Sequence, residues 1–390
     1  MSEGLRHSVS RADIRVLGKS NPARAEREFI SFWRKGYKAA HAGGLTPRSH
    51  AYILSHSDSE GVSRMQLNKN AKYVIGVDLG GTNARAAVVE KTGKIIGEGR
   101  TDSRAMEGLE ATIVQIVQAI RMAVNDAGVQ MAEVAGVGMG VPGTHKSEEG
   151  IVVWSPNFKD WNDVQLLAPI VEQTGVPAFM GNDANVAALG EYAFGAGRDS
   201  KIMVMFTLGT GIGSGLIING RIFVGVTETA PEMGHHIILA DGPRCSCGRY
   251  GCVESLCRRD AIVDRAARKA HQGRHTSLIE KSDHDLRYIT PAMIAEAASE
   301  GDPISIETLD EVGYYLGIAV SNAINILNPD KVVIGGGIAQ AGDLLFGPIR
   351  RSVEVNALYA PLQVVQILPA ELGDDAGVLG GAAMVLQRME

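Results

Sequence analysis

The chain has 390 residues, of which 45% are hydrophobic and 21% charged, a composition typical of a soluble globular protein with a sizeable core and room for two domains. No run approaches the roughly 18 apolar residues that a membrane span needs. The N-terminus also lacks the apolar core of a secretory signal, so we expect a cytoplasmic protein.

Charge is distributed unevenly along the chain. Residues 1–72 contain 13 Lys/Arg against 6 Asp/Glu, a net charge of +7, whereas the remainder has a net charge of −13. The acidic bulk argues against nucleic-acid binding by the main body and leaves that question open for the N-terminus.

Residues 1–72 lack the alternating pattern of strands, and we interpret them as a basic, poorly ordered extension. One helix is predicted at 22–41, followed by a linker. Because Met65 precedes the first strand by eight residues, we expect residues 1–64 to be dispensable for catalysis, and translation from Met65 is compatible with the sequence.

From Tyr73 onward, predicted strands and helices alternate, which indicates an α/β protein. We expect strands at 73–77, 86–89, 95–96, 134–141, 178–180, 201–208, 215–218 and 331–334, and helices at 109–127, 166–173, 183–194, 255–272, 291–299, 303–327 and 377–389.

A strand, a glycine turn and a second strand occur twice, at 77–82 (VDLGGT) and at 207–211 (TLGTG). This repetition predicts two similar halves with a ligand held between them, an arrangement that belongs to actin-like ATPases and sugar kinases. No P-loop motif is present. A GxGxxG match at 138–143 opens no convincing helix, so a dinucleotide site is not supported.

Glycine turns let backbone N–H groups approach phosphate oxygens, and nearby threonine hydroxyls add donors. An aspartate beside such a turn holds Mg²⁺ through water. A glycine run at the end of a strand offers bare backbone on which an adenosine ring could lie. The candidate ATP-binding residues are therefore Asp78, Gly80, Gly81, Thr82, Asn83, Gly209, Thr210, Gly211, Gly335, Gly336 and Gly337.

One histidine and three closely spaced cysteines make a Cys₃His set that predicts a structural zinc site: His235, Cys245, Cys247 and Cys252. Four protein ligands leave no position for substrate, so the metal would shape the loop and take no part in catalysis. Glu232 and Glu254 flank this loop, and together with the imidazole edge they suit sugar hydroxyls. Because we expect the glycine turns to lie elsewhere in the molecule, we expect metal loss to weaken sugar binding and to spare nucleotide affinity.

These motifs together resemble the ROK family of repressors, open reading frames and kinases, over Tyr73 to the C-terminus. The cysteine signature is the most specific part of the match. The resemblance implies two similar actin-like (ribonuclease H-like) domains with a cleft between them. Residues 73–182 would form the first domain, joined by the helix at 377–390, and residues 183–376 the second, with the zinc loop at 232–254.

The resemblance also implies roles for individual residues in an ATP-dependent hexokinase. Asp183 would be the general base, and the hexose would be bound by Asn157, Asn182, Glu232, His235 and Glu254. Without the resemblance, Asn182-Asp183 reads as a helix cap. Glucose is the first expectation, ATP, Mg²⁺ and a structural Zn²⁺ are the expected cofactors, and a homodimer or homotetramer is implied.

Two alternatives remain open. A ROK transcriptional repressor would carry an N-terminal helix-turn-helix, but residues 1–72 show no second helix with recognition spacing. A kinase for N-acetylhexosamine or fructose would use similar hydroxyl-reading residues. An actin-like scaffold or chaperone ATPase would have no need of the zinc loop.

Overall fold

The computed structural model describes residues 67–390, so the predicted helix at 22–41 and most of the proposed extension lie outside the described residues. Ala71, which the sequence assigns to that extension, is buried. It packs with Val74, Val378 and Ala382 in a small apolar cluster. The body of the fold therefore includes the residues just before the first strand.

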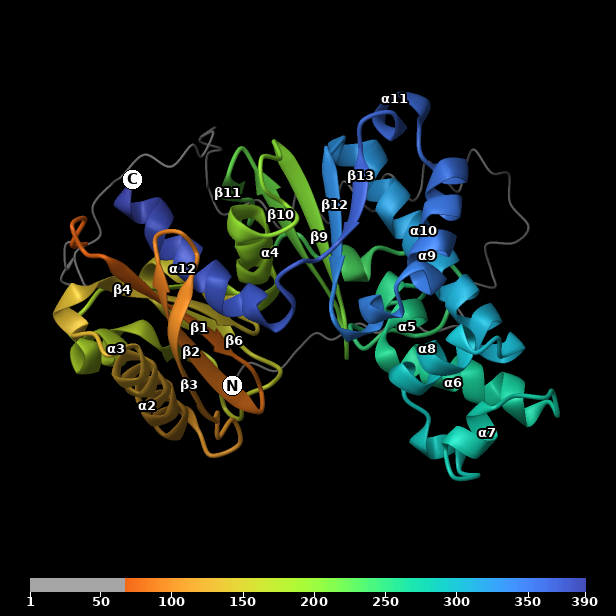
Figure 1. Cartoon of the computed structure of the whole chain (residues 1–390), viewed down its shortest axis with the longest axis horizontal. Helices are drawn as coiled ribbons and strands as arrows, with labels where there is room; N and C mark the ends of the chain where they lie inside the picture. Colours follow the sequence, from red (N-terminus) through yellow and green to blue (C-terminus); the bar gives the residue numbers. More distant parts are fainter. Residues whose placement is uncertain (1–66) are drawn as a thin grey trace, which may run out of the picture. The chain divides into compact units, whose positions relative to one another are not determined.

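The first half of the described chain is built on a five-stranded sheet of order β3-β2-β1-β4-β8 (Figure 1). β1 runs antiparallel to β2 and parallel to β4. The strands are β1 (Tyr73–Leu79), β2 (Asn83–Glu90), β3 (Ile95–Asp102), β4 (Val134–Val141) and β8 (Ala178–Asn182).

The second half repeats the same order of pairings, β11-β10-β9-β12-β13. β9 is antiparallel to β10 and parallel to β12. Both sheets thus start with a hairpin closed by a glycine turn, and the duplication predicted from the two turns is confirmed. The strands are β9 (Ile202–Leu208), β10 (Ile212–Ile218), β11 (Arg221–Ile222), β12 (Lys331–Gly335) and β13 (Gln366–Pro369).

Helices cover the outer face of each sheet (Figure 1). α2 (Leu109–Ala127) packs on β2 and β3, with α3 (Leu167–Thr174) beside it. The second sheet shares its largest apolar core with α5 (Val253–Cys257), α6 (Arg259–His271), α8 (Pro291–Ser299), α9 (Pro303–Leu327) and α10 (Asp343–Asn356).

Three smaller strands form a separate sheet: β5 (Thr144–Lys146), β6 (Ile151–Trp154) and β7 (Asn162–Gln165). Two short helices, α7 (Leu278–Lys281) and α11 (Tyr359–Leu362), belong to the second half.

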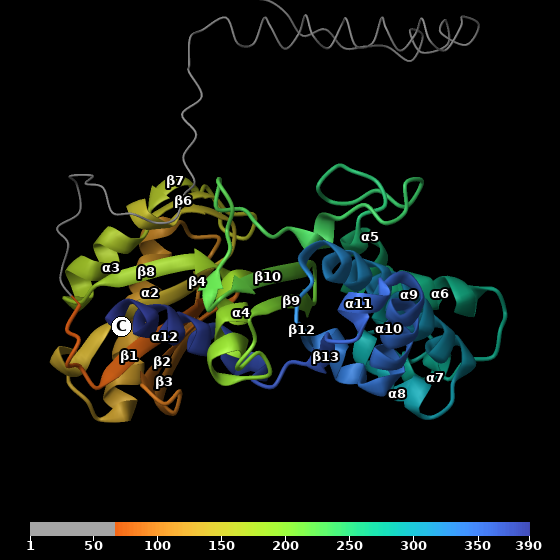
Figure 2. The same ribbon diagram turned by 90° about the horizontal axis from the view of Figure 1, so that it is seen from above.

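Two helices, α4 (Asp183–Phe194) and α12 (Ala376–Met389), pack on each other and lie between the two large sheets (Figure 2). Glycines make this approach possible. A Cβ atom at Gly138 would lie 2.0 Å from the Gly381 carbonyl oxygen, and one at Gly76 would lie 1.7 Å from that of Val378. The first glycine of the GxGxxG match therefore serves the packing of α12 on β4.

Elements with strong periodicity are confirmed, including the helices predicted at 109–127, 183–194, 291–299 and 303–327. The helix predicted at 255–272 is wrong in detail, because Arg258 has an extended backbone (φ −68°, ψ 163°) that separates α5 from α6. The small β5-β6-β7 sheet and α10 were not expected from the sequence.

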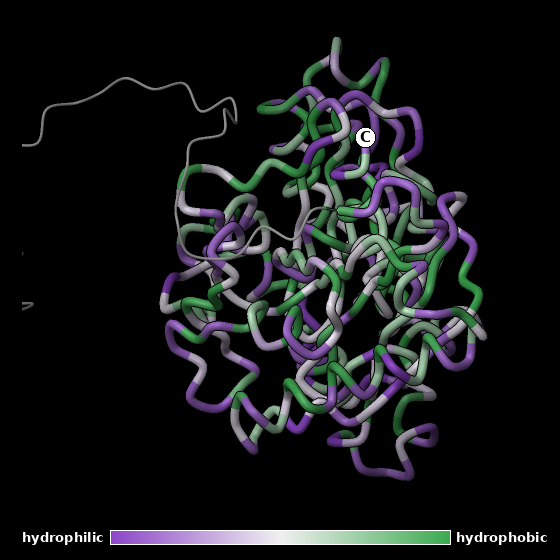
Figure 3. The backbone as a smooth tube through the Cα atoms, turned by 90° about the vertical axis from the view of Figure 1, so that its left-hand side faces the viewer, coloured by the Kyte–Doolittle hydropathy of each residue, from purple (hydrophilic) through white to green (hydrophobic). Residues whose placement is uncertain are grey.

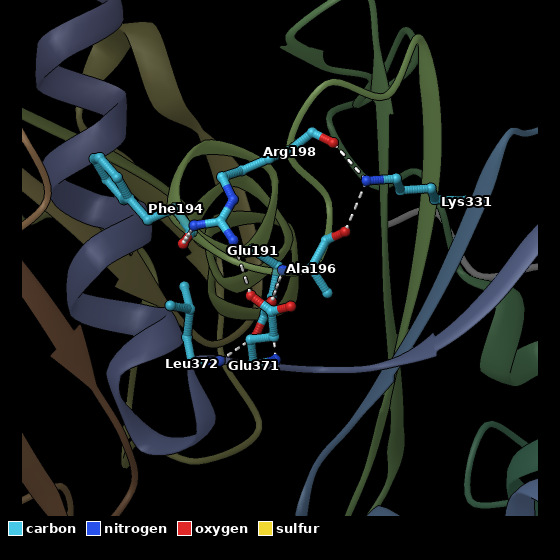
Figure 4. Close-up of polar contacts among 7 residues, drawn as sticks. All are labelled: Glu191, Phe194, Ala196, Arg198, Lys331, Glu371 and Leu372. Atoms are coloured by element: carbon cyan, nitrogen blue, oxygen red, sulfur yellow. Dashed lines mark hydrogen bonds and ion pairs between the residues drawn. The ribbon is translucent and has the colours of Figure 1, made fainter.

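The chain passes between the two halves after α4 and again before α12, and one buried side chain joins these two crossings (Figure 4). The Glu191 carboxylate, fully buried in α4, accepts hydrogen bonds from the N–H groups of Ala196 (2.9 Å), Glu371 (3.2 Å) and Leu372 (2.8 Å). It therefore holds the end of α4 and the approach to α12 together.

Hydrophobic and hydrophilic residues alternate along most of the trace in Figure 3, as expected where one side of each element faces a core. Within residues 67–390, none of the helices has both the length and the apolarity that crossing a bilayer would require.

Candidate functional site

The first glycine turn joins β1 to β2 and lies beside Asn157. The Gly80 N–H donates to the Asn83 carbonyl at 2.8 Å, which closes the turn. A Cβ atom at Gly81 would be 3.4 Å from the Asn157 Cβ atom. The structure thus brings a candidate sugar-binding residue next to a candidate nucleotide-binding turn.

Asp78 precedes this turn, near the end of β1. Burial, aided by the negative charge of Asp183, raises the pKa of Asp78 to about 6, while the Arg85 guanidinium opposes the rise. The backbone of α12 passes close to this carboxylate, since a Cβ atom at Gly377 would lie 2.6 Å from the Asp78 Cγ atom. A buried, poorly neutralised carboxylate of this kind suits a divalent cation.

The second and third glycine runs are neighbours. The Gly209 N–H donates to the Gly211 carbonyl at 3.0 Å across the β9–β10 turn. Gly336 adopts φ +89°, and a Cβ atom there would lie 2.3 Å from the carbonyl oxygen of Leu208, directly before that turn. Space above Gly209 and Gly337 is open, so ligand atoms can approach the bare backbone.

Asn182 ends β8 and caps α4. Its Oδ1 atom accepts from the N–H groups of Ala184 (3.1 Å) and Asn185 (3.3 Å), while its amide nitrogen donates to the Gly143 carbonyl at 3.4 Å. The cap interpretation is therefore correct as local geometry. It also fixes Asp183 as the first residue of α4.

Burial raises the pKa of Asp183, against hydrogen bonds from backbone N–H groups and from Asn182 that lower it. The Asp183 charge in turn raises the pKa values of Asp78 and Glu232, so Asp183 lies within electrostatic reach of both carboxylates. A carboxylate whose pKa is raised is a better proton acceptor near neutral pH.

The predicted zinc ligands converge. The ligand atoms of His235, Cys245, Cys247 and Cys252 all lie within 4.8 Å of one another. The Cys247 and Cys252 sulfurs are 3.7 Å apart, and the Cys245 sulfur is 3.6 Å from His235 Nδ1. A tetrahedron with zinc–sulfur bonds of about 2.3 Å has edges of about 3.8 Å, so the cluster fits such an ion.

His235 Nδ1 faces the cluster, which leaves Nε2 for another partner. Cys257 is buried on α5 and contacts the Val312 carbonyl, so it belongs to the core.

Glu232 precedes the cluster in a tight turn on β10. A Cβ atom at Gly234 would lie 2.1 Å from the Ile212 carbonyl oxygen, so only glycine allows this contact. Burial raises the pKa of Glu232, His235 lowers it, and the charges of Glu254 and Asp183 raise it further. The charges of His235, Glu254 and Asp183 therefore all act on the Glu232 carboxylate.

Glu254 connects the cysteine loop to the second glycine turn. Its Oε2 atom accepts from the Ile212 N–H at 3.1 Å, and its Oε1 atom accepts from the Ser246 hydroxyl at 2.9 Å. The Arg259 N–H also donates to the Gly209 carbonyl at 3.0 Å. These contacts join the loop at 232–254 to the second glycine turn, which is a candidate phosphate site. The expectation that the glycine turns lie apart from this loop is therefore wrong for the second turn.

Some residues at this site were missed by sequence reasoning. Arg85 bonds to Asp375 and Glu98 beside Asp78, and Ser214 holds the backbone on both sides of Glu232. Their partners are distant in sequence, and neither residue belongs to a motif.

Three comparisons identify the family. The model of the ROK family matches residues 74–388. The glucokinase of Thermotoga maritima is 37% identical over 316 residues, covering 81% of this chain and 98% of that protein. The xylose repressor of Caldicellulosiruptor bescii is 31% identical over 381 residues, covering 98% of this chain and 92% of that protein.

The fold is likewise matched by the crystal structure of a ROK family glucokinase from Streptomyces griseus in complex with glucose and AMPPNP. The TM-score is 0.70 at 32% identity, over 81% of this chain and 99% of that one. The two-domain actin-like fold follows from this similarity and from the duplicated sheets. The chain therefore belongs to the ROK family.

Proposed function

We propose that this chain is an ATP-dependent hexokinase that transfers the γ-phosphate of ATP to the primary hydroxyl of a hexose, with glucose as the first candidate. The observation that carries the proposal is that the charges of Asp183, His235 and Glu254 all act on Glu232, while Glu254 bonds to the backbone beside a glycine turn with open space above it. Glucokinases among the relatives and the glucose complex of the Streptomyces griseus protein support it.

Asp183 is the proposed general base. Its carboxylate would accept the proton of the primary hydroxyl as that oxygen attacks the γ-phosphorus in line, and the bond from phosphorus to the leaving ADP oxygen breaks. The raised pKa of Asp183 suits proton acceptance near neutral pH. Glu232, His235 Nε2, Glu254, Asn157 and Asn182 would orient the sugar through its other hydroxyls.

The N–H groups of the two glycine turns would position the phosphates. Asp78 would hold a Mg²⁺ ion, which supplies positive charge to the phosphates when it is bound. His235 and the three cysteines would hold a structural zinc ion, which shapes the loop between Glu232 and Glu254 when it is bound.

The experiment is a phosphorylation panel with purified full-length protein and Mg-ATP. Glucose, mannose, fructose, N-acetylglucosamine and N-acetylmannosamine are offered separately, and ADP release is followed together with the mass of the sugar product. We expect a hexose 6-phosphate, with glucose used most efficiently. ADP release that does not depend on any sugar would contradict the proposal.

A sugar-responsive transcriptional repressor is the second candidate function, because the match to the xylose repressor takes in 98% of this chain and so most of its basic first 66 residues. The glucokinase match covers 81% of the chain. The main body would then sense a sugar, while the N-terminus would bind DNA.

The two candidates are separated by comparing the full chain with a chain starting at Met65. A repressor loses specific binding to operator DNA on truncation, whereas the hexokinase keeps its kcat and KM values. Sugar-dependent DNA binding by the full chain, without hexose phosphorylation, would establish the repressor instead.

A further inference from the structure

The position of the Glu232 carboxylate is set by the backbone around it. Within residues 67–390 its side chain makes no hydrogen bond, although its backbone carbonyl accepts from the His235 N–H at 3.0 Å. A carboxylate that must read one sugar hydroxyl then depends on the backbone that carries it. The groups that hold the peptides on either side of Glu232 thus set its position.

Ser214 holds both of those peptides. Its hydroxyl donates to the Pro231 carbonyl at 2.8 Å and accepts from the Met233 N–H at 3.0 Å. A serine hydroxyl has one proton and two lone pairs, so a single side chain can satisfy both flanking groups at once. Alanine at this position would satisfy neither.

The placement of Ser214 on β10 explains why it can do this. Gly213 and Gly215 lie on the other face of the strand, where Cβ atoms would come within 3.0 Å or less of the α4 side chains Ala184 and Ala188. Side chains alternate along a strand, so Ser214 points away from α4. It lies 4% exposed, next to Ile212 and Leu216 of the apolar core.

A hydroxyl among apolar side chains is costly unless it is hydrogen-bonded, and this one is bonded on both sides. The same turn is held from a second element, because the Asn185 amide donates to the Ala230 carbonyl at 3.1 Å. Asn185 belongs to α4, the helix that begins with Asp183. The turn carrying Glu232 is thus fixed both to β10 and to the helix of the proposed base.

We propose that Ser214 is a positioning residue that fixes Glu232 relative to Asp183, so that both carboxylates meet the same hexose. Ser214 itself touches no substrate and acts through Glu232. The proposal rests on the proposed hexokinase function and adds to it a specificity residue outside every recognised motif.

The test measures hexose and ATP kinetics for Ser214→Ala, Ser214→Thr and Glu232→Gln. Losing both hydrogen bonds at the turn should raise the hexose KM about tenfold in Ser214→Ala, with the ATP KM changed less than about twofold. Ser214→Thr keeps the hydroxyl and should stay close to wild type. The double variant Ser214→Ala/Glu232→Gln should have the same hexose KM as Glu232→Gln alone, because both changes act on the same carboxylate.

Ser321→Ala is the matched control. Ser321 is equally buried, on α9, and donates to the Gly317 carbonyl at 2.7 Å, far along the chain from the turn. It should leave the hexose KM unchanged. If Ser214→Ala does not fold, the threonine and cysteine variants carry the test, with only the cysteine variant expected to lose hexose affinity.

Additive effects of Ser214→Ala and Glu232→Gln, or an unchanged hexose KM in a folded Ser214→Ala, would overturn the assignment. Failure of the proposed function gives a different result, since the wild-type protein would then phosphorylate no hexose. In that case, calorimetric titration of glucose into the wild type and into Ser214→Ala compares their glucose affinities and still reports whether Ser214 shapes a sugar site.

Discussion

Ionised Asp78 is buried, and its ionisation should lower the stability of the folded protein by a measurable amount. Its pKa is raised from 3.8 to about 6, mainly by burial. The folded protein therefore binds this proton more tightly than the unfolded chain, so stability from this group is present at low pH and lost as pH rises through about 6. A difference of this size corresponds to about 2–3 kcal/mol.

Asp78→Asn should remove the loss of stability that comes from ionising a buried carboxylate. In magnesium-free buffer, we expect the variant to be more stable than wild type at pH 7.5, with the difference shrinking toward pH 4.5, while hexokinase activity is largely lost. Urea unfolding at several pH values checks the prediction. A stability difference that does not change across this range would show that Asp78 is not ionised at a cost.

The residues at the site differ in how well the sequence could predict them. The Cys₃His cluster was predicted because its ligands are close in sequence and belong to a known signature. The bond from Ile212 to Glu254 joins positions 42 residues apart, and Ser214 meets Pro231 across 17 residues. No local pattern marks such pairs, because they form only when β10 and the loop pack together.

At the scale of elements, the crossing between the two halves depends on Glu191. Its buried carboxylate accepts three backbone N–H groups from two segments. Glu191→Ala would leave these donors unpaired, and we expect a loss of at least about 2 kcal/mol in the free energy of unfolding.

Glu371→Ala is the control in the same crossing. The Glu371 carboxylate is 54% exposed and pairs with Arg198 at 3.2 Å, so its loss should cost less than about 1 kcal/mol. Urea unfolding compares the two variants, and equal midpoints would refute the role of Glu191.

The loop between Glu232 and Glu254 is the second element that can be tested. We expect one zinc per chain by elemental analysis, with three thiols protected from alkylation until the metal is removed. Because Glu254 and Arg259 contact the second glycine turn, Cys247→Ser should raise the KM for ATP as well as for hexose. Fully active protein that contains no zinc would contradict this interpretation.

Across the whole molecule, the duplicated sheets could be predicted from two short glycine turns, because a hairpin is a local structure. The contact of α12 with β1 and β4 depends on glycines more than 200 residues apart, such as Gly138 and Gly381. Nothing in the sequence pairs these glycines, so this contact could be seen only in the structure. The GxGxxG match shows that a glycine motif can serve helix packing as readily as ligand binding.

In the proposed reaction, Asp183 takes the proton of a hexose hydroxyl while that oxygen receives the phosphoryl group of ATP. The most direct measurement is the kcat of wild type and Asp183→Asn with glucose and Mg-ATP, with glucose affinity determined separately by calorimetry. We predict that kcat falls by about two to four orders of magnitude, as for loss of a general base, while glucose still binds. Turnover close to that of wild type in Asp183→Asn would show that Asp183 is not the general base.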